Sequence, residues 1–303
     1  MTASASLPYV VFGVSGRTGA AAADALLRAG CPVRVVVRDP AKGRPWAERG
    51  AELAVADLTD FASVTKALRR ARAAYLLSPP HYQREDLFER AGVVADVAAR
   101  AALAADVPRL VALSSVGADR ASGTGWIRMN RLFEQRLAET GLPTVFLRAA
   151  YFMENWLPMV GQAVRSGVLP TFLAPPQRAL PMVAAVDVGS AAALLLQEDR
   201  AGSGVVALTG PKDYAPRDVA ALVAAALQQP VELAVLPEAA WPEALADAQF
   251  SRAALAGFTE MTRGLNSSHI DIKSDPAALE WAGRTPLERV IAELVQRQQE
   301  AVV

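Results

Sequence analysis

The feature that most constrains the fold is a glycine loop near the start of the chain, between an apolar run and a helical pattern. Residues 8–13 read PYVVFG, and a helical pattern covers residues 17–29. Between them the spacing is Gly13-x-x-Gly16-x-x-Gly19. The first glycine permits a tight turn, the second lets the backbone approach a phosphate, and the third lets the helix pack close to the strand. This order predicts a strand, turn and helix of the kind that binds dinucleotides.

The start of this helix is the expected position of a pyrophosphate, because free N–H groups and the positive end of the helix dipole both favour an anion there. The residues expected to hold it are Gly13, Ser15, Gly16, Arg17, Thr18 and Gly19. The alternative is an Ala- and Gly-rich helix start with no ligand. A second strand follows within the length of one βαβ unit, which favours the dinucleotide.

Short apolar runs alternate with helical patterns through the first half of the chain. The runs are continuous, as in strands that are buried on both faces. This alternation predicts a doubly wound, parallel α/β sheet of the Rossmann type, with ligands at the carboxyl ends of its strands. The expected strands are 8–13, 32–37, 52–56, 73–78, 109–114, 143–148 and 205–210. The expected helices are 17–29, 60–70, 85–105, 125–140, 187–197, 216–228, 238–247 and 286–299.

The regular alternation weakens after residue 150, where prolines become frequent. We therefore expect a Rossmann domain over 1–150, rejoined by 184–210, and a smaller C-terminal α+β substrate-binding lobe over 151–303. Segment 151–182 is expected to form loops around one helix. Asp187 is the expected N-cap of the helix that follows, because its side chain can accept from free backbone N–H groups.

The residue at the end of the second strand bears on the choice between NAD and NADP. NAD-binding units place an acid there, which accepts from the ribose hydroxyls. The sequence VRVVVRDP instead places Arg38 there, followed by Asp39. A guanidinium suits a 2′-phosphate through charge-assisted bonds, so we expect NADP(H), with Arg17 and Lys42 as further cations. The alternative for Arg38 is a solvated charge paired with Asp39.

The ends of the third and fourth strands are expected to enclose the adenosine. Asp57 and Leu58 follow the third strand, where a carboxylate can accept from the exocyclic amine of adenine. That carboxylate can instead cap the next helix, a role open to Asp60 as well. The expected apolar wall against the ribose consists of Leu77, Ser78 and Pro79.

Composition excludes several classes of function. Lys and Arg total 31 residues and so do Asp and Glu, so we expect no general attraction to nucleic acid or to an acidic membrane. No apolar run reaches the roughly 18 residues of a membrane span, and the N-terminus lacks the pattern of a signal peptide. Cys31 is the only cysteine, which favours a cytoplasmic protein without disulfides. One cysteine and two distant histidines predict no metal site.

Several short motifs, spread over nearly the whole chain, can be compared with those of known protein families. They are VFGVSGRTG, VRVVVRDPAK, ADLTD, YLLSPP, LVALSSVGAD, GLPTVFLRAAYFMENW, VDVG and GRTP. Together they resemble the NmrA-like family of atypical short-chain dehydrogenase/reductases. The resemblance implies a Rossmann domain, a smaller substrate lobe and NADP(H). It implies reductase activity for many members, such as quinone and triphenylmethane reductases, and nucleotide binding without turnover for a few redox sensors.

The chain lacks the Tyr-x-x-x-Lys pair of ordinary short-chain dehydrogenases, since no tyrosine is followed by lysine four residues on. Some NmrA-like reductases carry a lysine or histidine on the helix before the GLPTVFLR strand, and the resemblance puts that position at Asn130. An asparagine can donate a hydrogen bond but is no general acid near neutral pH. This fits a reaction that needs only hydride transfer and a proton from solvent, and it equally fits a sensor without turnover.

The remaining candidate residues surround the expected nicotinamide. Asn130 and Tyr151 are the candidate catalytic residues, and Ser114, Tyr151 and Phe152 are expected to contact the cofactor. Substrate contacts are expected from His81, Tyr82, Val116, Trp126, Asn130, Phe152, Asn155 and Trp156. Some of them have a structural alternative: a strand-end turn for Ser114, a surface loop for His81, a buried helix stripe for Trp126, and a core cluster between lobes for 151–156.

Two functions follow from these residues. The first is an NADPH-dependent reductase that transfers a hydride to a small, flat, apolar electrophile, such as a quinone, an imine or iminium, or a conjugated carbonyl. The second is an NADP(H)-binding redox sensor that recognises a partner protein. A small molecule is the expected partner of the reductase, and both a monomer and a homodimer remain open.

The substitution Arg38→Ala tests the expected choice of cofactor. We expect it to weaken NADPH binding strongly and NADH binding little, because only NADPH carries the 2′-phosphate that the guanidinium would bind. Titration of the purified variant with each nucleotide measures both affinities. Equal losses for the two nucleotides would contradict the assignment of Arg38.

Overall fold

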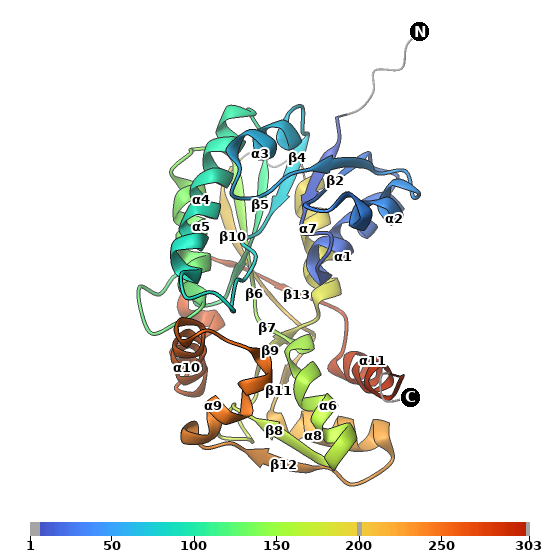
Figure 1. Ribbon diagram of the computed structural model, residues 1–303, viewed down its shortest axis with the longest axis vertical. Helices are drawn as coiled ribbons and strands as arrows, with labels where there is room; N and C mark the ends of the chain where they lie inside the picture. The colour runs from blue at the N-terminus through green and yellow to red at the C-terminus, as the bar shows by residue number, and fades with distance from the viewer. Residues whose placement is uncertain (1–6, 199–201, 301–303) are drawn as a thin grey trace.

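The computed structural model describes residues 7–198 and 202–300. At its centre is a sheet of eight strands in the order β13-β10-β6-β5-β4-β1-β2-β3, and every neighbouring pair is parallel (Figure 1). The strands are β1 (Tyr9–Phe12), β2 (Val33–Val37), β3 (Glu52–Val55), β4 (Ala73–Leu76), β5 (Leu110–Ser115), β6 (Thr144–Ala149), β10 (Gly204–Thr209) and β13 (Leu279–Ala282). The predicted doubly wound parallel sheet is confirmed. The strand order reverses between β1 and β4, which is where such sheets form a ligand crevice.

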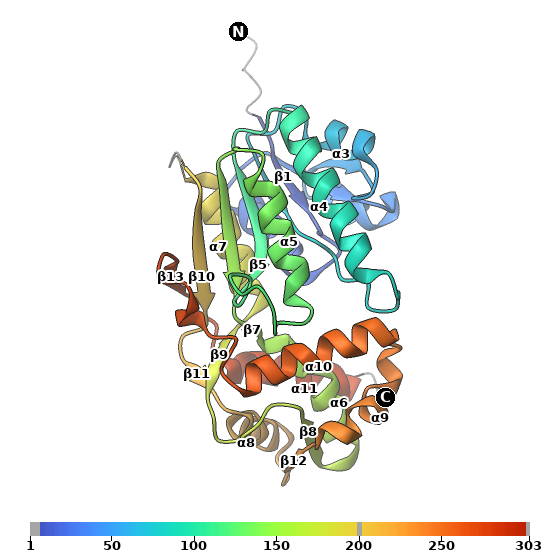
Figure 2. The same ribbon diagram turned by 90° about the vertical axis from the view of Figure 1, so that its left-hand side faces the viewer.

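Helices cover both faces of this sheet (Figures 1 and 2). One face carries α1 (Arg17–Arg28), the short α2 (Arg44–Ala47) and α7 (Ala185–Gln197); the other carries α3 (Phe61–Leu68), α4 (Leu87–Ala104) and α5 (Ile127–Ala138). Successive side chains of a strand point to opposite faces. Accordingly Val11 lies in the core under α1 and α7, whereas Val10 and Phe12 lie in the core under α3, α4 and α5. Burial on both faces explains the continuous apolar runs of the sequence.

Helices α1 and α7 cross closely at Gly189. A Cβ atom at Gly189 would lie 2.4 Å from Cβ of Ala21 and 2.6 Å from the carbonyl oxygen of Thr18. The absence of a side chain therefore lets the two backbones approach, and it brings the start of α7 beside the glycine loop. Because α7 contributes to the same core as α1 and β1, the segment after residue 184 packs as part of the half that contains the eight-stranded sheet.

The chain after residue 150 also builds a smaller α+β lobe beyond the carboxyl edge of the sheet (Figure 1). Its two small sheets contain β7 (Tyr151–Phe152), β9 (Leu180–Val183) and β11 (Asp213–Tyr214), and β8 (Val168–Thr171) with β12 (Glu232–Val235). Its helices are α6 (Leu157–Ser166), α8 (Pro216–Leu227), α9 (Trp241–Ala244), α10 (Arg252–Asn266) and α11 (Leu287–Glu300). The predicted C-terminal α+β lobe is confirmed, and its core forms around buried Met153, Trp156 and Leu294.

Several local predictions after residue 150 were wrong. The helix expected over 238–247 breaks into 3₁₀ turns on either side of the short α9. The helix α10 was not predicted. The strand β13 was not predicted either, because it is mostly exposed and lacks an apolar run. Asp187 lies in the first turn of α7, whose N-cap is Ala184, and it accepts instead from the N–H and hydroxyl of Thr285 at 2.8 and 2.9 Å.

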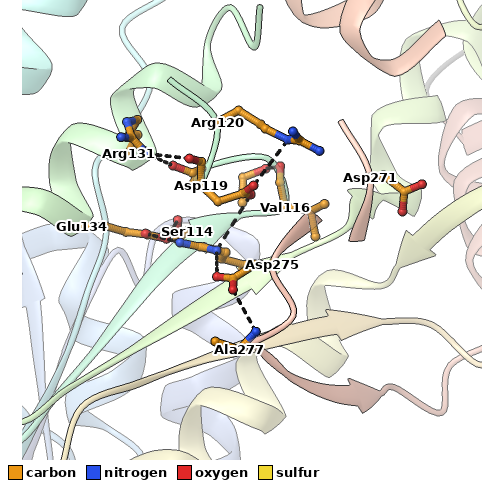
Figure 3. A network of polar contacts seen from close by, with 12 residues as sticks. Ser114, Val116, Asp119, Arg120, Arg131, Glu134, Asp271, Asp275 and Ala277 are labelled. Atoms are coloured by element: carbon orange, nitrogen blue, oxygen red, sulfur yellow. Dashed lines mark hydrogen bonds and ion pairs between the residues drawn. The ribbon is translucent and has the colours of Figure 1, made fainter. Parts of the chain in front are cut away.

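A buried ion-pair network fastens the segment before β13 to the sheet. Arg148 on β6 donates to both carboxylate oxygens of Glu134 on α5, at 2.8 and 2.7 Å, and to Oδ2 of Asp275 at 2.7 Å. The Ser114 hydroxyl donates to the same Glu134 carboxylate at 2.5 Å, so Ser114, Glu134 and Asp275 meet in one place (Figure 3). Arg148 and Glu134 are both buried, so each charge relies on the other in place of water.

The substitution Arg148→Met should therefore lower the free energy of unfolding by about 3–5 kcal/mol, because it leaves the Glu134 carboxylate buried without its partner. The double variant Arg148→Met/Glu134→Leu should recover most of that loss, since no buried charge remains. Equilibrium unfolding in urea measures both. The control is Arg289→Met, which removes an exposed pair with Glu293 and should change stability by less than about 1 kcal/mol. Equal losses in the single and double variants would contradict this account.

Candidate functional site

A cleft of about 440 Å³ lies along the carboxyl edge of the parallel sheet, where the strand order reverses. The loop after β1, the ends of β2, β3 and β4, and the segment after β6 all contribute to its walls. Most of the residues that the sequence singled out line this cleft. They are Gly13, Ser15, Gly16, Arg17, Thr18, Arg38, Asp57, Leu58, Leu77, Ser78, Pro79, His81, Phe152 and Asn155.

The glycine loop shapes the floor of the cleft. Gly13 has a φ of +73°, and the N–H of Gly16 donates to its carbonyl oxygen at 2.8 Å. A Cβ atom at Gly19 would lie 2.4 Å from that same oxygen, so α1 can begin this close to β1 only without a side chain there. A Cβ atom at Gly16 would meet only the Gly13 carbonyl oxygen, at 3.4 Å. Gly13 and Gly19 therefore serve the fold, whereas Gly16 leaves open space for a ligand.

Charged side chains gather at the end of the cleft formed by β2 and β3. Asp57 accepts from the N–H and hydroxyl of Thr59, at 2.8 and 2.7 Å, and these bonds, with smaller contributions from Arg38 and Arg90, lower the pKa of its carboxyl. Asp60, not Asp57, is the N-cap of α3. The Asp57 carboxylate therefore stays ionised and is held at the cleft wall rather than in a helix cap.

Arg38 projects from the end of β2 into the cleft as an exposed side chain. Asp39 accepts from the N–H of Ala41 at 2.9 Å and caps the 3₁₀ turn η1 (Pro40–Gly43). Among the described residues, Arg38 forms no ion pair with a carboxylate, so its guanidinium is available to an anion in the cleft.

Nine of the candidate site residues do not line this cleft. They are Gly19, Lys42, Tyr82, Ser114, Val116, Trp126, Asn130, Tyr151 and Trp156. Gly19 packs against β1, and Ser114 is held by Glu134 in the ion-pair network (Figure 3). Val116 packs between two hydrophobic cores, and Trp156 is fully buried in the core of the lobe. Asn130 is half-buried on α5.

Tyr82 and Trp126 belong to an aromatic cluster between the two lobes. Their rings stack with centroids 3.8 Å apart, and Phe250 meets both edge-on. The loop that carries Tyr82 is tied to the start of α10, where the Ser251 N–H donates to the Tyr82 carbonyl oxygen at 2.9 Å. The two carboxylate oxygens of Glu85 accept from the first N–H groups of α10. This cluster adjoins the cleft through His81 and closes the space between the loop and α10.

The segment after β6 provides the opposite wall. Phe152 and Asn155 line the cleft, whereas the Tyr151 ring packs against the core of the lobe, with Trp156 as an edge-on neighbour. Burial raises the pKa of the Tyr151 hydroxyl, although a hydrogen bond with Asn155 opposes the shift. Tyr151 therefore stays protonated at neutral pH and can donate a hydrogen bond but cannot act as a base.

The structure adds two charged residues that the sequence analysis missed. Arg90 on α4 lines the cleft, and no local pattern distinguishes it from other arginines on amphipathic helices. Glu154 also lines the cleft, and both of its carboxylate oxygens accept from the N–H of Ala185, at 2.9 and 3.1 Å. Burial raises the pKa of this carboxyl. Glu154 therefore fastens the start of α7 to the cleft wall, and its place in the YFMENW stretch was the available signal.

The comparison with known families decides the classification. A model of the NmrA-like family matches residues 9–283. The chain belongs to the NmrA-like family. An NAD(P)H azoreductase from Xenophilus azovorans is 28% identical over 260 residues, which cover 82% of this chain and 86% of the relative.

Solved structures share the NmrA-like fold at lower identity. The triphenylmethane reductase of Citrobacter sp. superposes with a TM-score of 0.78 at 18% identity, covering 95% of this chain and 99% of that one. The NADPH-dependent quinone oxidoreductase of Escherichia coli, solved with NADPH, gives a TM-score of 0.76 at 23% identity, covering 94% and 99%. These likenesses establish the fold of this NmrA-like chain.

Within residues 7–198 and 202–300, no helix is long and apolar enough to cross a membrane. Over the same described residues, no group of three or more His, Cys, Asp or Glu side chains is arranged to hold a metal ion.

Two glycine substitutions separate nucleotide binding from folding. Gly16→Ala should lower the free energy of unfolding by less than about 1 kcal/mol, because Ala differs here only in being a poorer N-cap than Gly. Its added methyl group should nevertheless weaken NADPH binding about tenfold or more. Gly19→Ala should destabilise the empty protein by about 1–3 kcal/mol, because its methyl group overlaps the Gly13 carbonyl. Thermal unfolding without nucleotide and titration with NADPH measure the two effects. A Gly16→Ala variant that binds NADPH like the parent would overturn the role of Gly16.

Proposed function

We propose that the protein is an NADPH-dependent oxidoreductase that reduces a small, flat, apolar electrophile. The observation that carries this proposal is the composition of one continuous cleft. Its floor is the glycine loop, one end presents the Arg38 guanidinium, and the other presents the apolar side chains of Leu113 and Phe152. Phosphates, a ribose phosphate and a flat nicotinamide require these three surfaces in this order.

The residues present fit NADP(H). The open space over Gly16, which a Cβ atom would partly fill, suits a pyrophosphate at the start of α1. Arg38 suits a 2′-phosphate, and the ionised Asp57 suits the amine of adenine. Bound NADPH would supply a hydride to the substrate. The chain itself would hold the nucleotide, keep water from its reactive end and orient the substrate.

The reduction also consumes a proton, and the residues considered so far include no clear donor for it. The position that the family resemblance assigns to a proton donor is Asn130, which cannot act as an acid near neutral pH. Tyr151 keeps its proton because burial raises its pKa, and Ser114 is held by Glu134. These observations favour electrophiles that accept a hydride first and a proton from solvent afterwards. Quinones, imines or iminium ions, and conjugated carbonyls meet this requirement.

The relatives support the same class of substrate. By name they reduce azo compounds, quinones and triphenylmethane dyes, all of which are conjugated electrophiles. A redox sensor without turnover is the second candidate function, and the observation that favours it is the lack of an acid at Asn130. In a sensor the same cleft would bind NADP(H), and the lobe would recognise a partner protein.

Steady-state oxidation of NADPH in the presence of quinones, imines and conjugated carbonyls tests the proposal. We expect turnover with at least one class, and we expect the Arg38→Ala variant to raise KM for NADPH with a smaller effect on kcat, because Arg38 would bind the nucleotide far from the transferred hydride. The variant also controls for contaminating reductases, whose KM would not change. Tight NADPH binding with no turnover on any class would favour the sensor.

A further inference from the structure

Three basic side chains surround the end of the cleft where the 2′-phosphate is expected. Arg38 extends from the end of β2, His81 comes from the loop after β4, and Arg90 comes from the first half of α4. All three line the cleft. Of these three side chains, the sequence analysis assigned only Arg38 to the nucleotide, and it placed His81 with the substrate. The structure instead groups His81 with the two arginines.

Arg90 is held by a neutral acceptor. Its Nε donates to Nε2 of His81 at 3.3 Å, and among the described residues its guanidinium forms no ion pair with a carboxylate. The hydrogen bonds from Thr59 lower the pKa of the Asp57 carboxyl most, and Arg38 and Arg90 lower it further, so both guanidinium groups lie near this one carboxylate. That carboxylate is already occupied by Thr59. The two arginines therefore keep unused N–H donors toward the cleft.

His81 must be unprotonated at Nε2 to accept from Arg90. Burial lowers its pKa, Arg90, Arg38 and Arg84 lower it further, and Asp57 acts in the opposite direction. These are the charged groups that face His81 from α4, β2, its own loop and the end of β3. In the free protein the imidazole is therefore neutral at neutral pH, and a dianion placed among these cations would favour its protonated form.

We propose that Arg90 and His81, together with Arg38, form the site that recognises the 2′-phosphate of NADP(H), and that this recognition strengthens as the pH falls. The inference rests on the proposed nucleotide-binding function and assigns two residues to it. A phosphate dianion has enough oxygen atoms to accept from both guanidinium groups and from a protonated imidazole, once the Arg90 Nε–H turns from Nε2 of His81 to the phosphate. Arg90 would be the second specificity-determining cation, and His81 would give the site its pH dependence.

Binding of the 2′-phosphate is coupled to binding of a proton by His81, and this coupling sets the direction in which affinity changes with pH. The pKa of His81 is below its ordinary value in the free protein, and the phosphate raises it in the complex. Binding therefore takes up a proton between these two pKa values, so affinity rises as the pH falls through that interval. A phosphate monoester keeps its second charge above pH of about 6, so titration from pH 8.5 to 6.5 isolates the imidazole.

The experiment compares 2′,5′-ADP with 5′-AMP, which differ only in the 2′-phosphate, by calorimetric titration of the full-length protein. Arg90→Gln should weaken binding of 2′,5′-ADP about tenfold or more, as expected for a lost charge-assisted contact, and should leave 5′-AMP within about twofold. The matched control is Arg100→Gln on the same helix, whose guanidinium lies over Phe61 outside the cleft. It should change neither affinity by more than about twofold.

The pH dependence is tested with His81→Asn, whose side-chain oxygen can still accept from Arg90. In the parent protein the ratio of the two affinities should rise about three- to tenfold from pH 8.5 to 6.5, and in His81→Asn it should stay flat. Equal losses of both ligands in Arg90→Gln, or the same pH dependence in His81→Asn as in the parent, would overturn the inference. If the parent protein bound neither ligand, the proposed nucleotide-binding function itself would fail.

Discussion

The close approach of α1 to β1 at Gly19 is the contact on which the remaining site depends. The helix begins against the Gly13 carbonyl oxygen with no room for a side chain, so its free N–H groups face the carboxyl edge of the sheet. The same lack of a side chain at Gly189 lets α7 cross α1. Two glycines far apart in the sequence thus join the first strand, the first helix and α7 into one packed unit, and the cleft forms at its edge.

Electrostatics divides the polar residues near the sheet edge into two groups. Arg148, Glu134 and Asp275 satisfy one another, and with Ser114 they hold a late segment against β5 and β6. These charged groups stabilise the fold and are not available to a ligand, because removal of either partner would leave a buried charge without a counter-ion. Arg38 and Arg90 line the cleft instead, and among the described residues neither forms an ion pair with a carboxylate. Guanidinium groups without a carboxylate partner at a ligand-binding edge are the physical basis for assigning them to an anionic ligand.

Much of the fold could be predicted because it follows from local patterns. Strands buried on both faces produce continuous apolar runs, and the parallel sheet followed from their alternation with helices. The lobe was predicted only as a region, since its strands are as short as Tyr151–Phe152 and are defined by pairing rather than by composition. α10 has an amphipathic pattern that the sequence analysis passed over, and β13 pairs with β10 at the edge of the sheet through the backbone.

The sequence by itself determined the glycine loop, the strand ends and the cation at Arg38, because each lies at a fixed spacing from the element that positions it. It also determined that Tyr-x-x-x-Lys is absent. Only the tertiary structure decided that Ser114 faces Glu134 and that Arg90 meets His81 beside Arg38. These relations depend on how α4 and α5 pack on the sheet, and a pattern along the chain does not record which side chains two packed helices bring together.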